Sequence, residues 1–221
     1  RNVVKASDII STGMGLKNKE KMLLHLAAWF HDTGYAKSSV EHEEESVKIA
    51  ADFLRSLKVE EDIINSVAEL ILATKYPQQP LNEMAQVLCD ADLLHLSDSN
   101  YIEKAEILRY EWKTLKEKEY TDDEWIQINI DFLTNHRYYT SFCRENFEKA
   151  KRKNIKRLVA LREQMTSIAE NPTLAVLTEN KDEFEDIKPD RSIDTLLKTV
   201  TQNHMRLSDM ADKKSNMLIS V

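Results

Sequence analysis

The chain has 221 residues, of which 42% are hydrophobic and 31% are charged, and it contains only three glycines and four prolines. So few turn-forming residues, and no window of strict apolar–polar alternation, exclude a sheet of many strands and favour an all-α protein. The net charge of −7 argues against binding of bulk nucleic acid, and two cysteines without CxxC spacing suit a reducing cytosol. Residues 1–10 lack the apolar core of a signal peptide, and no stretch of about 20 apolar residues predicts a complete membrane span.

Apolar residues recur at helical spacing along the first three quarters of the chain. Asn18 is the expected N-cap of the second helix, whose surface is apolar on most sides and which we therefore expect to be central and buried. Thr121 and Glu124 form a capping-box pattern at the start of a later helix. The predicted helices cover residues 3–10, 18–31, 41–57, 60–73, 81–96, 101–118, 121–137 and 141–166.

The composition changes after residue 167. Residues 168–191 carry two prolines and a run of acids, so we predict an acidic linker there. Residues 192–221 carry apolar side chains at alternating spacings of four and three, which predicts a C-terminal amphipathic helix. This helix would either pack on the main domain, residues 1–167, or form an oligomerising stalk, and the pattern leaves both alternatives open.

His31 and Asp32 follow the apolar helix directly and precede Gly34. Imidazole nitrogen and carboxylate oxygen are donors for a divalent metal. Adjacent side chains diverge by about 100° on a straight helix, but they can converge where the helix ends and a glycine lets the backbone turn. The alternative is a histidine that caps a helix C-terminus.

A second chemical pattern lies in the apolar stretch around residues 84–95, which contains Asp90 and Asp92. Buried carboxylates are costly unless they are paired or bind a metal. Asp92 shares a helix face with His95, whereas Asp90 points elsewhere and is expected to orient a neighbour. A partly exposed acidic helix is the alternative.

The strings LAAWFHDTGY and DADLLH, in this order, resemble the HD superfamily of metal-dependent phosphohydrolases over about residues 1–165. The resemblance implies an HD-domain helical bundle and a metal set of His31, Asp32 and Asp92, completed by a histidine one helix upstream. The opening of the chain resembles the residues just after that histidine, so we expect it to precede Arg1. The implied cofactor is a divalent ion of manganese, magnesium, iron or zinc.

Two further positions follow from the resemblance. His42 stands where two-metal members of the family carry an extra histidine. Lys75 stands where those members carry a histidine pair, and a protonated lysine is a poor ligand, so the second metal is expected to be absent. Lys75 would instead supply a positive charge for a phosphate, or be an ordinary surface lysine.

His136 and Arg137 join two predicted helices and are candidate partners for a phosphate or a base, with a solvated basic helix as the alternative. Residues 203–221 resemble the opening of the membrane-spanning effector domain of cyclic-pyrimidine antiphage (Pycsar) systems. That resemblance implies a membrane-anchored protein on the cytoplasmic face, and we expect it to be a homo-oligomer.

The first functional hypothesis is a metal-dependent phosphohydrolase or phosphodiesterase that acts on a nucleotide or cyclic nucleotide. Asp32 would orient the attacking water, and His42 or Glu43 would protonate the leaving oxygen. Alarmone hydrolysis is disfavoured because residues 33–37 lack the Glu-Asp pair of those relatives. The alternatives are a cyclic-nucleotide sensor that gates a membrane effector with little turnover, and a helical oligomerisation module.

Overall fold

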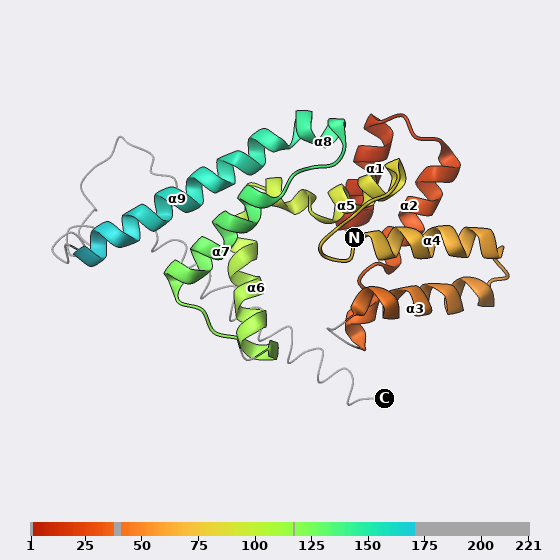
Figure 1. The fold of residues 1–221 in the computed structure, drawn as a ribbon, viewed down its shortest axis with the longest axis horizontal. Coiled ribbons are helices and arrows are strands. Elements are labelled where there is room, and N and C mark those ends of the chain that lie inside the picture. The colour runs from red at the N-terminus through yellow and green to blue at the C-terminus, as the bar shows by residue number, and fades with distance from the viewer. Residues whose placement is uncertain (1, 38–40, 117, 171–221) are drawn as a thin grey trace, which may run out of the picture. The chain divides into compact units, whose positions relative to one another are not determined.

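The computed structural model describes residues 2–37, 41–116 and 118–170 of the chain (Figure 1). Within these ranges it has α-helices, two short 3₁₀ helices and no strand, which confirms the all-α prediction. The elements are α1 (Asn2–Gly13), α2 (Asn18–Phe30), η1 (Thr33–Ala36), α3 (His42–Ser56), α4 (Glu61–Ala73), α5 (Glu83–Asp92), η2 (Leu94–Ser97), α6 (Tyr101–Lys116), α7 (Asp122–Asn135), α8 (Ser141–Asn146) and α9 (Glu148–Glu170).

The contacts divide the chain into two compact units. The first unit comprises residues 1–99 and 133–154, and the second comprises residues 100–132 and those from 155 onward. Residues 171–221 hold most of the predicted linker and all of the predicted C-terminal helix, and they lie outside the described residues. The stalk, the resemblance to an antiphage effector and the membrane anchor therefore stay predictions.

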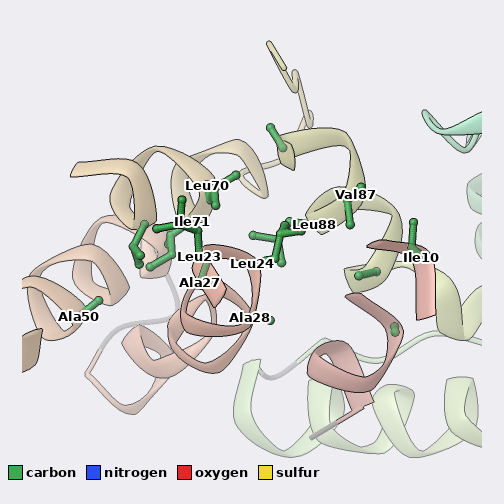
Figure 2. Close-up of a cluster of buried hydrophobic side chains, with 14 of the residues drawn as sticks. Ile10, Leu23, Leu24, Ala27, Ala28, Ala50, Leu70, Ile71, Val87 and Leu88 are labelled. Carbon is green, nitrogen blue, oxygen red and sulfur yellow. The ribbon is translucent and has the colours of Figure 1, made fainter. Parts of the chain in front are cut away.

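The core of the first unit forms around α2, which contacts α1, α4 and α5 (Figure 2). Leu24 and Ala27 on α2 are fully buried, as are Val67 on α4 and Leu88 on α5. Alanine side chains let neighbouring helices approach closely, and the larger leucines fill the space between them. Burial of this apolar surface is the main stabilising contribution to the unit that holds the candidate site.

The prediction that α2 is buried on most sides is wrong for one side of the helix, where Met22 and Trp29 are exposed. Trp29 is 57% exposed, although Leu23, Leu24, Ala27 and Ala28 on the same helix are buried. Only the side of α2 that faces α1, α4 and α5 is covered, because α3 contacts the helix less extensively. A run of apolar letters therefore overstated how much of the helix surface is enclosed.

Two predicted helices are each divided in the structure. The stretch 81–96 forms α5, which ends at Asp92, and the 3₁₀ helix η2, which begins at Leu94. At this division the Asp92 carbonyl oxygen lies 3.0 Å from the side-chain nitrogen Nδ1 of His95. The stretch 141–166 divides at Phe147 into α8 and α9. Asn146 Nδ2 donates to the Phe142 carbonyl at 2.8 Å, which is the side-chain competition that disfavours asparagine inside helices.

The N-terminal ends of α2 and α7 test the capping predictions. The N-cap position of α2 is Lys17 rather than Asn18, because the Glu20 carboxylate accepts the Lys17 backbone N–H at 2.7 Å. At α7 the predicted capping box is confirmed: Thr121 N–H donates to Glu124 Oε2 at 2.8 Å, and Glu124 N–H donates to Thr121 Oγ1 at 3.3 Å.

The second unit has its own buried polar and aromatic contacts. Tyr101 Oη donates to Asn129 Oδ1 at 2.7 Å, and Asn129 Nδ2 donates to the Trp125 carbonyl at 2.8 Å. Trp112 packs edge-on against Trp125 with ring centroids 5.6 Å apart. These contacts tie α6 to α7, since a buried hydroxyl and amide satisfy each other.

Candidate metal centre

Gly34 determines how the chain turns after α2. Its backbone N–H donates to Ser46 Oγ on α3 at 2.8 Å. A Cβ at this position would lie 1.9 Å from the His42 carbonyl oxygen, so no residue with a side chain fits without moving backbone. The close approach packs η1 on the first turns of α3 and brings Asp32, the residue before η1, next to His42.

The structure brings together the three side chains expected to bind a metal. His31 Nε2 lies 3.0 Å from Asp32 Oδ2 and 3.4 Å from Asp92 Oδ1. One ligand atom from each of the three residues lies within 4.8 Å of the others. Two come from the end of α2 and one from the last residue of α5, so the contact between these helices forms the cluster.

The hydrogen bonding of His31 fits a metal ligand. His31 Nδ1 lies 3.0 Å from the Ala28 carbonyl, which can only accept, so Nδ1 carries a proton, and Nε2 is the nitrogen that would bind a metal once it gives up its own proton. His31 is 5% exposed, and its Nε2 has no hydrogen-bond partner of good geometry. A buried imidazole nitrogen that faces two carboxylates, with its other nitrogen bonded to a backbone carbonyl, could serve as a ligand of a divalent cation.

The electrostatics of the cluster favour positive charge between the carboxylates. Burial by itself lowers the pKa of His31, but Asp32 and Asp92 outweigh burial and raise that pKa to about 10. Burial would raise the pKa of Asp32, but His31 and His42 outweigh it and hold that pKa below its usual range. The carboxylates that favour a proton on His31 would equally favour a metal cation in its place.

The predicted catalytic residues His42 and Glu43 lie beside this cluster. His42 Nε2 is 3.6 Å from Asp32 Oδ1 and 3.3 Å from Glu43 Oε1. The His42 ring stacks on Tyr35 with centroids 3.7 Å apart, which restricts its rotation. Asp32 thus directs one oxygen toward His31 and the other toward His42.

Lys75 lies outside the three-residue cluster. Its ammonium forms an ion pair with Glu44 on α3, and its side chain is 45% exposed. The contact with Glu44 is the main cause of its raised pKa, to which Glu41 and Glu43 also contribute, so Lys75 is a cation near the first turn of α3. A phosphate would have to compete with Glu44 for this ammonium.

His136 is engaged in packing contacts away from the three ligands. Its carbonyl accepts from Lys151 Nζ at 2.6 Å, and its ring packs edge-on against Tyr138 at 4.8 Å. Burial, and then the Lys151 charge, lower the pKa of His136 to about 4, so its imidazole is neutral at pH 7. Arg137 is exposed. Neither residue is brought into the cluster, so their predicted role in binding substrate gains no support from these contacts.

Three residues that the sequence analysis did not assign to the site lie around Asp92. Gln78 Nε2 donates to Asp92 Oδ2 at 3.4 Å, and Tyr139 Oη donates to the Gln78 carbonyl at 2.8 Å. Asp90 is completely buried and accepts hydrogen bonds from the segment that carries Tyr139. An acid inside an apolar helix was a signal for Asp90, but no sequence pattern marks Gln78 or Tyr139.

Among the described residues, no helix is both long and apolar enough to cross a membrane. Neither the curated proteins nor the solved structures compared with this chain include a match. Nothing found supports the resemblance in residues 203–221. Residues 1–97 match the model of the HD domain family, whose members are typically metal-dependent hydrolases, and this match supports an HD-superfamily domain in that part of the chain.

Proposed function

We propose that this protein is a metal-dependent phosphohydrolase or phosphodiesterase that acts on a nucleotide or cyclic nucleotide. The observation that carries the proposal is the buried His31 Nε2, which lies 3.0 Å from Asp32 Oδ2 and 3.4 Å from Asp92 Oδ1, so that one ligand atom from each residue converges on one point. The family match to residues 1–97 supports the hydrolase class. A divalent ion held by these three residues would supply Lewis-acid activation of water and of a phosphoryl oxygen.

The surrounding side chains suit the proton transfers of phosphoester hydrolysis. Asp32 is ionised at neutral pH, because its pKa is held below the usual range, and it can therefore accept a hydrogen bond from the attacking water. His42, whose Nε2 lies 3.6 Å from Asp32 Oδ1, would protonate the leaving oxygen. Glu43, which is 7% exposed, and the Tyr35 ring hold the imidazole of His42 in this position.

The test is metal content measured together with turnover. The purified protein is incubated with Mn²⁺, desalted and analysed for bound metal, and hydrolysis of a phosphodiester, bis(p-nitrophenyl) phosphate, and of 3′,5′-cyclic nucleotides is followed. We expect bound metal and turnover in the wild type and the loss of both in Asp32→Ala. Asp52→Ala, which removes an exposed acid from α3, should change neither. A wild-type protein without bound metal or turnover would refute the proposal.

The sensing alternative is favoured by one observation. Lys75, which stands where two-metal relatives carry ligands, is paired with Glu44 and offers no lone pair to a metal. A cyclic nucleotide that binds to the metal-loaded protein without any product over many hours would favour sensing over hydrolysis. Product formation at a rate that depends on Asp32 would favour the enzyme.

A further inference from the structure

Asp92 has two carboxylate oxygens with different neighbours. Oδ1 lies 3.4 Å from His31 Nε2, on the side of the candidate metal. Oδ2 accepts from Gln78 Nε2 at 3.4 Å, a long hydrogen bond from the segment between α4 and α5. Since the side chain of Asp92 is 25% exposed, solvent alone does not determine its rotamer. The amide of Gln78 therefore discriminates between the two oxygens.

Gln78 is itself held by a contact from another part of the chain. Tyr139, in the segment between α7 and α8, donates its hydroxyl hydrogen to the Gln78 carbonyl oxygen at 2.8 Å. This distance is typical of a strong neutral hydrogen bond. The bond ties the backbone of Gln78 to a distant segment, and this fixes the point from which the Gln78 side chain reaches Asp92.

Tyr139 is in turn fixed by the buried carboxylate of Asp90. Tyr139 N–H donates to Asp90 Oδ1 at 2.8 Å, and Thr140 N–H donates to Asp90 Oδ2 at 2.9 Å. Asp90 and Asp92 lie two residues apart on α5 and point in different directions. The contacts therefore form a closed circuit within the first unit, from Asp90 through Tyr139 and Gln78 back to Asp92.

We propose that Gln78 is a positioning residue for the metal ligand Asp92, and that Tyr139 holds Gln78 in place for this role. The inference rests on the proposed metal centre. Residues that orient a ligand through a hydrogen bond commonly change metal affinity by about 10-fold to 100-fold when they are removed. Because the bond of Gln78 to Asp92 is long, we expect the lower end of this range, about 10-fold.

The experiment measures Mn²⁺ affinity by calorimetry and the melting temperature of the metal-free protein. Gln78→Ala should weaken Mn²⁺ binding about 10-fold, and Tyr139→Phe, which removes only the hydroxyl, about threefold. In the double variant the loss should equal that of Gln78→Ala alone, because Tyr139 acts through Gln78. Gln79→Ala, an exposed neighbour on the same segment, is the matched control and should bind like the wild type.

Several results would overturn the inference. They are a Gln78→Ala affinity within twofold of the wild type, an equal loss in Gln79→Ala, or losses that add in the double variant. A loss that follows the melting temperature across the variants would also count against positioning. Hydrolysis is measured in parallel. If Gln78→Ala weakens Mn²⁺ binding but no variant, including the wild type, shows turnover, the positioning role is supported and the hydrolase is refuted. If Gln78→Ala keeps both normal turnover and normal Mn²⁺ affinity, the hydrolase is supported and the positioning role is refuted. No Mn²⁺ binding by the wild type overturns both.

Discussion

Replacement of Asp90 by alanine tests the most completely satisfied buried acid of the first unit. Asp90 is 0% exposed and accepts hydrogen bonds from Tyr139 N–H at 2.8 Å, Thr140 N–H at 2.9 Å and Thr140 Oγ1 at 2.7 Å. Burial raises the pKa of Asp90, and the three hydrogen bonds oppose that rise. Its structural value therefore lies in accepting hydrogen bonds rather than in its charge.

The expected cost of Asp90→Ala follows from the donors that lose their acceptor. Each buried donor without a partner costs about 1–3 kcal/mol. The Thr140 hydroxyl can rotate, so the two backbone N–H groups dominate, and a water in the space left by the carboxylate would offset part of the loss. We expect about 3 kcal/mol in the free energy of unfolding, or about 6–12 °C in melting temperature for a chain of this size.

The assay is urea unfolding followed by circular dichroism, with two comparison variants. Thr140→Val removes the hydroxyl that bonds Asp90 and that accepts Cys143 N–H at 3.1 Å, so it should cost about 1–2 kcal/mol. Asp52→Ala on α3 is the exposed control and should stay within about 0.5 kcal/mol. If Asp90→Ala costs no more than Asp52→Ala, the hydrogen bonds of Asp90 do not stabilise the fold and the reasoning fails.

The remaining predictions concern Gly34 and His136. Gly34→Ala should cost about 3 kcal/mol in the free energy of unfolding and weaken Mn²⁺ binding, because its Cβ would lie 1.9 Å from the His42 carbonyl oxygen. Gly15→Ala is the control: the space around Gly15 is open but its φ is +73°, so the substitution should cost only about 1 kcal/mol. Equal losses in the two variants would contradict this prediction. The folded pKa of His136, about 4, lies below its ordinary value of 6.5, so the unfolded chain binds the extra proton and stability falls as pH decreases from about 6.5 toward 4. Since His136 is partly exposed, we expect this residue to account for about 1 kcal/mol of the loss between pH 7 and pH 5. His136→Asn should remove that part in urea titrations at the two pH values, whereas identical losses in both proteins would show that another group titrates.

Helical spacing of apolar residues was enough to predict the fold class and most helices of the described residues. Helix α4 is an example, because the residues that the spacing places on one face are the ones that face the core. The apolar residues at helical spacing in this stretch are buried or half-buried: Ile64, Val67, Leu70 and Ile71 are buried, and Ile63 is half-buried. The pattern failed where a polar side chain ends a helix locally. Where α8 ends, the Asn146 side chain donates to the Phe142 carbonyl, and an apolar period does not reveal such a bond.

The candidate site was predictable to different degrees in its different layers. His31, Asp32 and Asp92 could be named from motif resemblance, and the structure brings their ligand atoms within 4.8 Å. Gln78 and Tyr139 could not be named, because their contacts depend on how two loops meet. Tyr139 bonds the backbone carbonyl of Gln78, and every residue carries such a carbonyl, so the sequence alone does not indicate which residue Tyr139 contacts.

The two acids at the end of α5 show why hydrogen-bond satisfaction is informative about function. Asp90 is buried and all its demands are met by protein donors, which is the pattern of a residue that stabilises the fold. Asp92 instead faces the buried Nε2 of His31, which lies 3.4 Å from Asp92 Oδ1 and 3.0 Å from Asp32 Oδ2. Two carboxylates that converge on one buried imidazole favour a positive charge between them. The contacts of His31 with Asp32 and Asp92 therefore fit a divalent cation held by these three residues, independently of the HD motif.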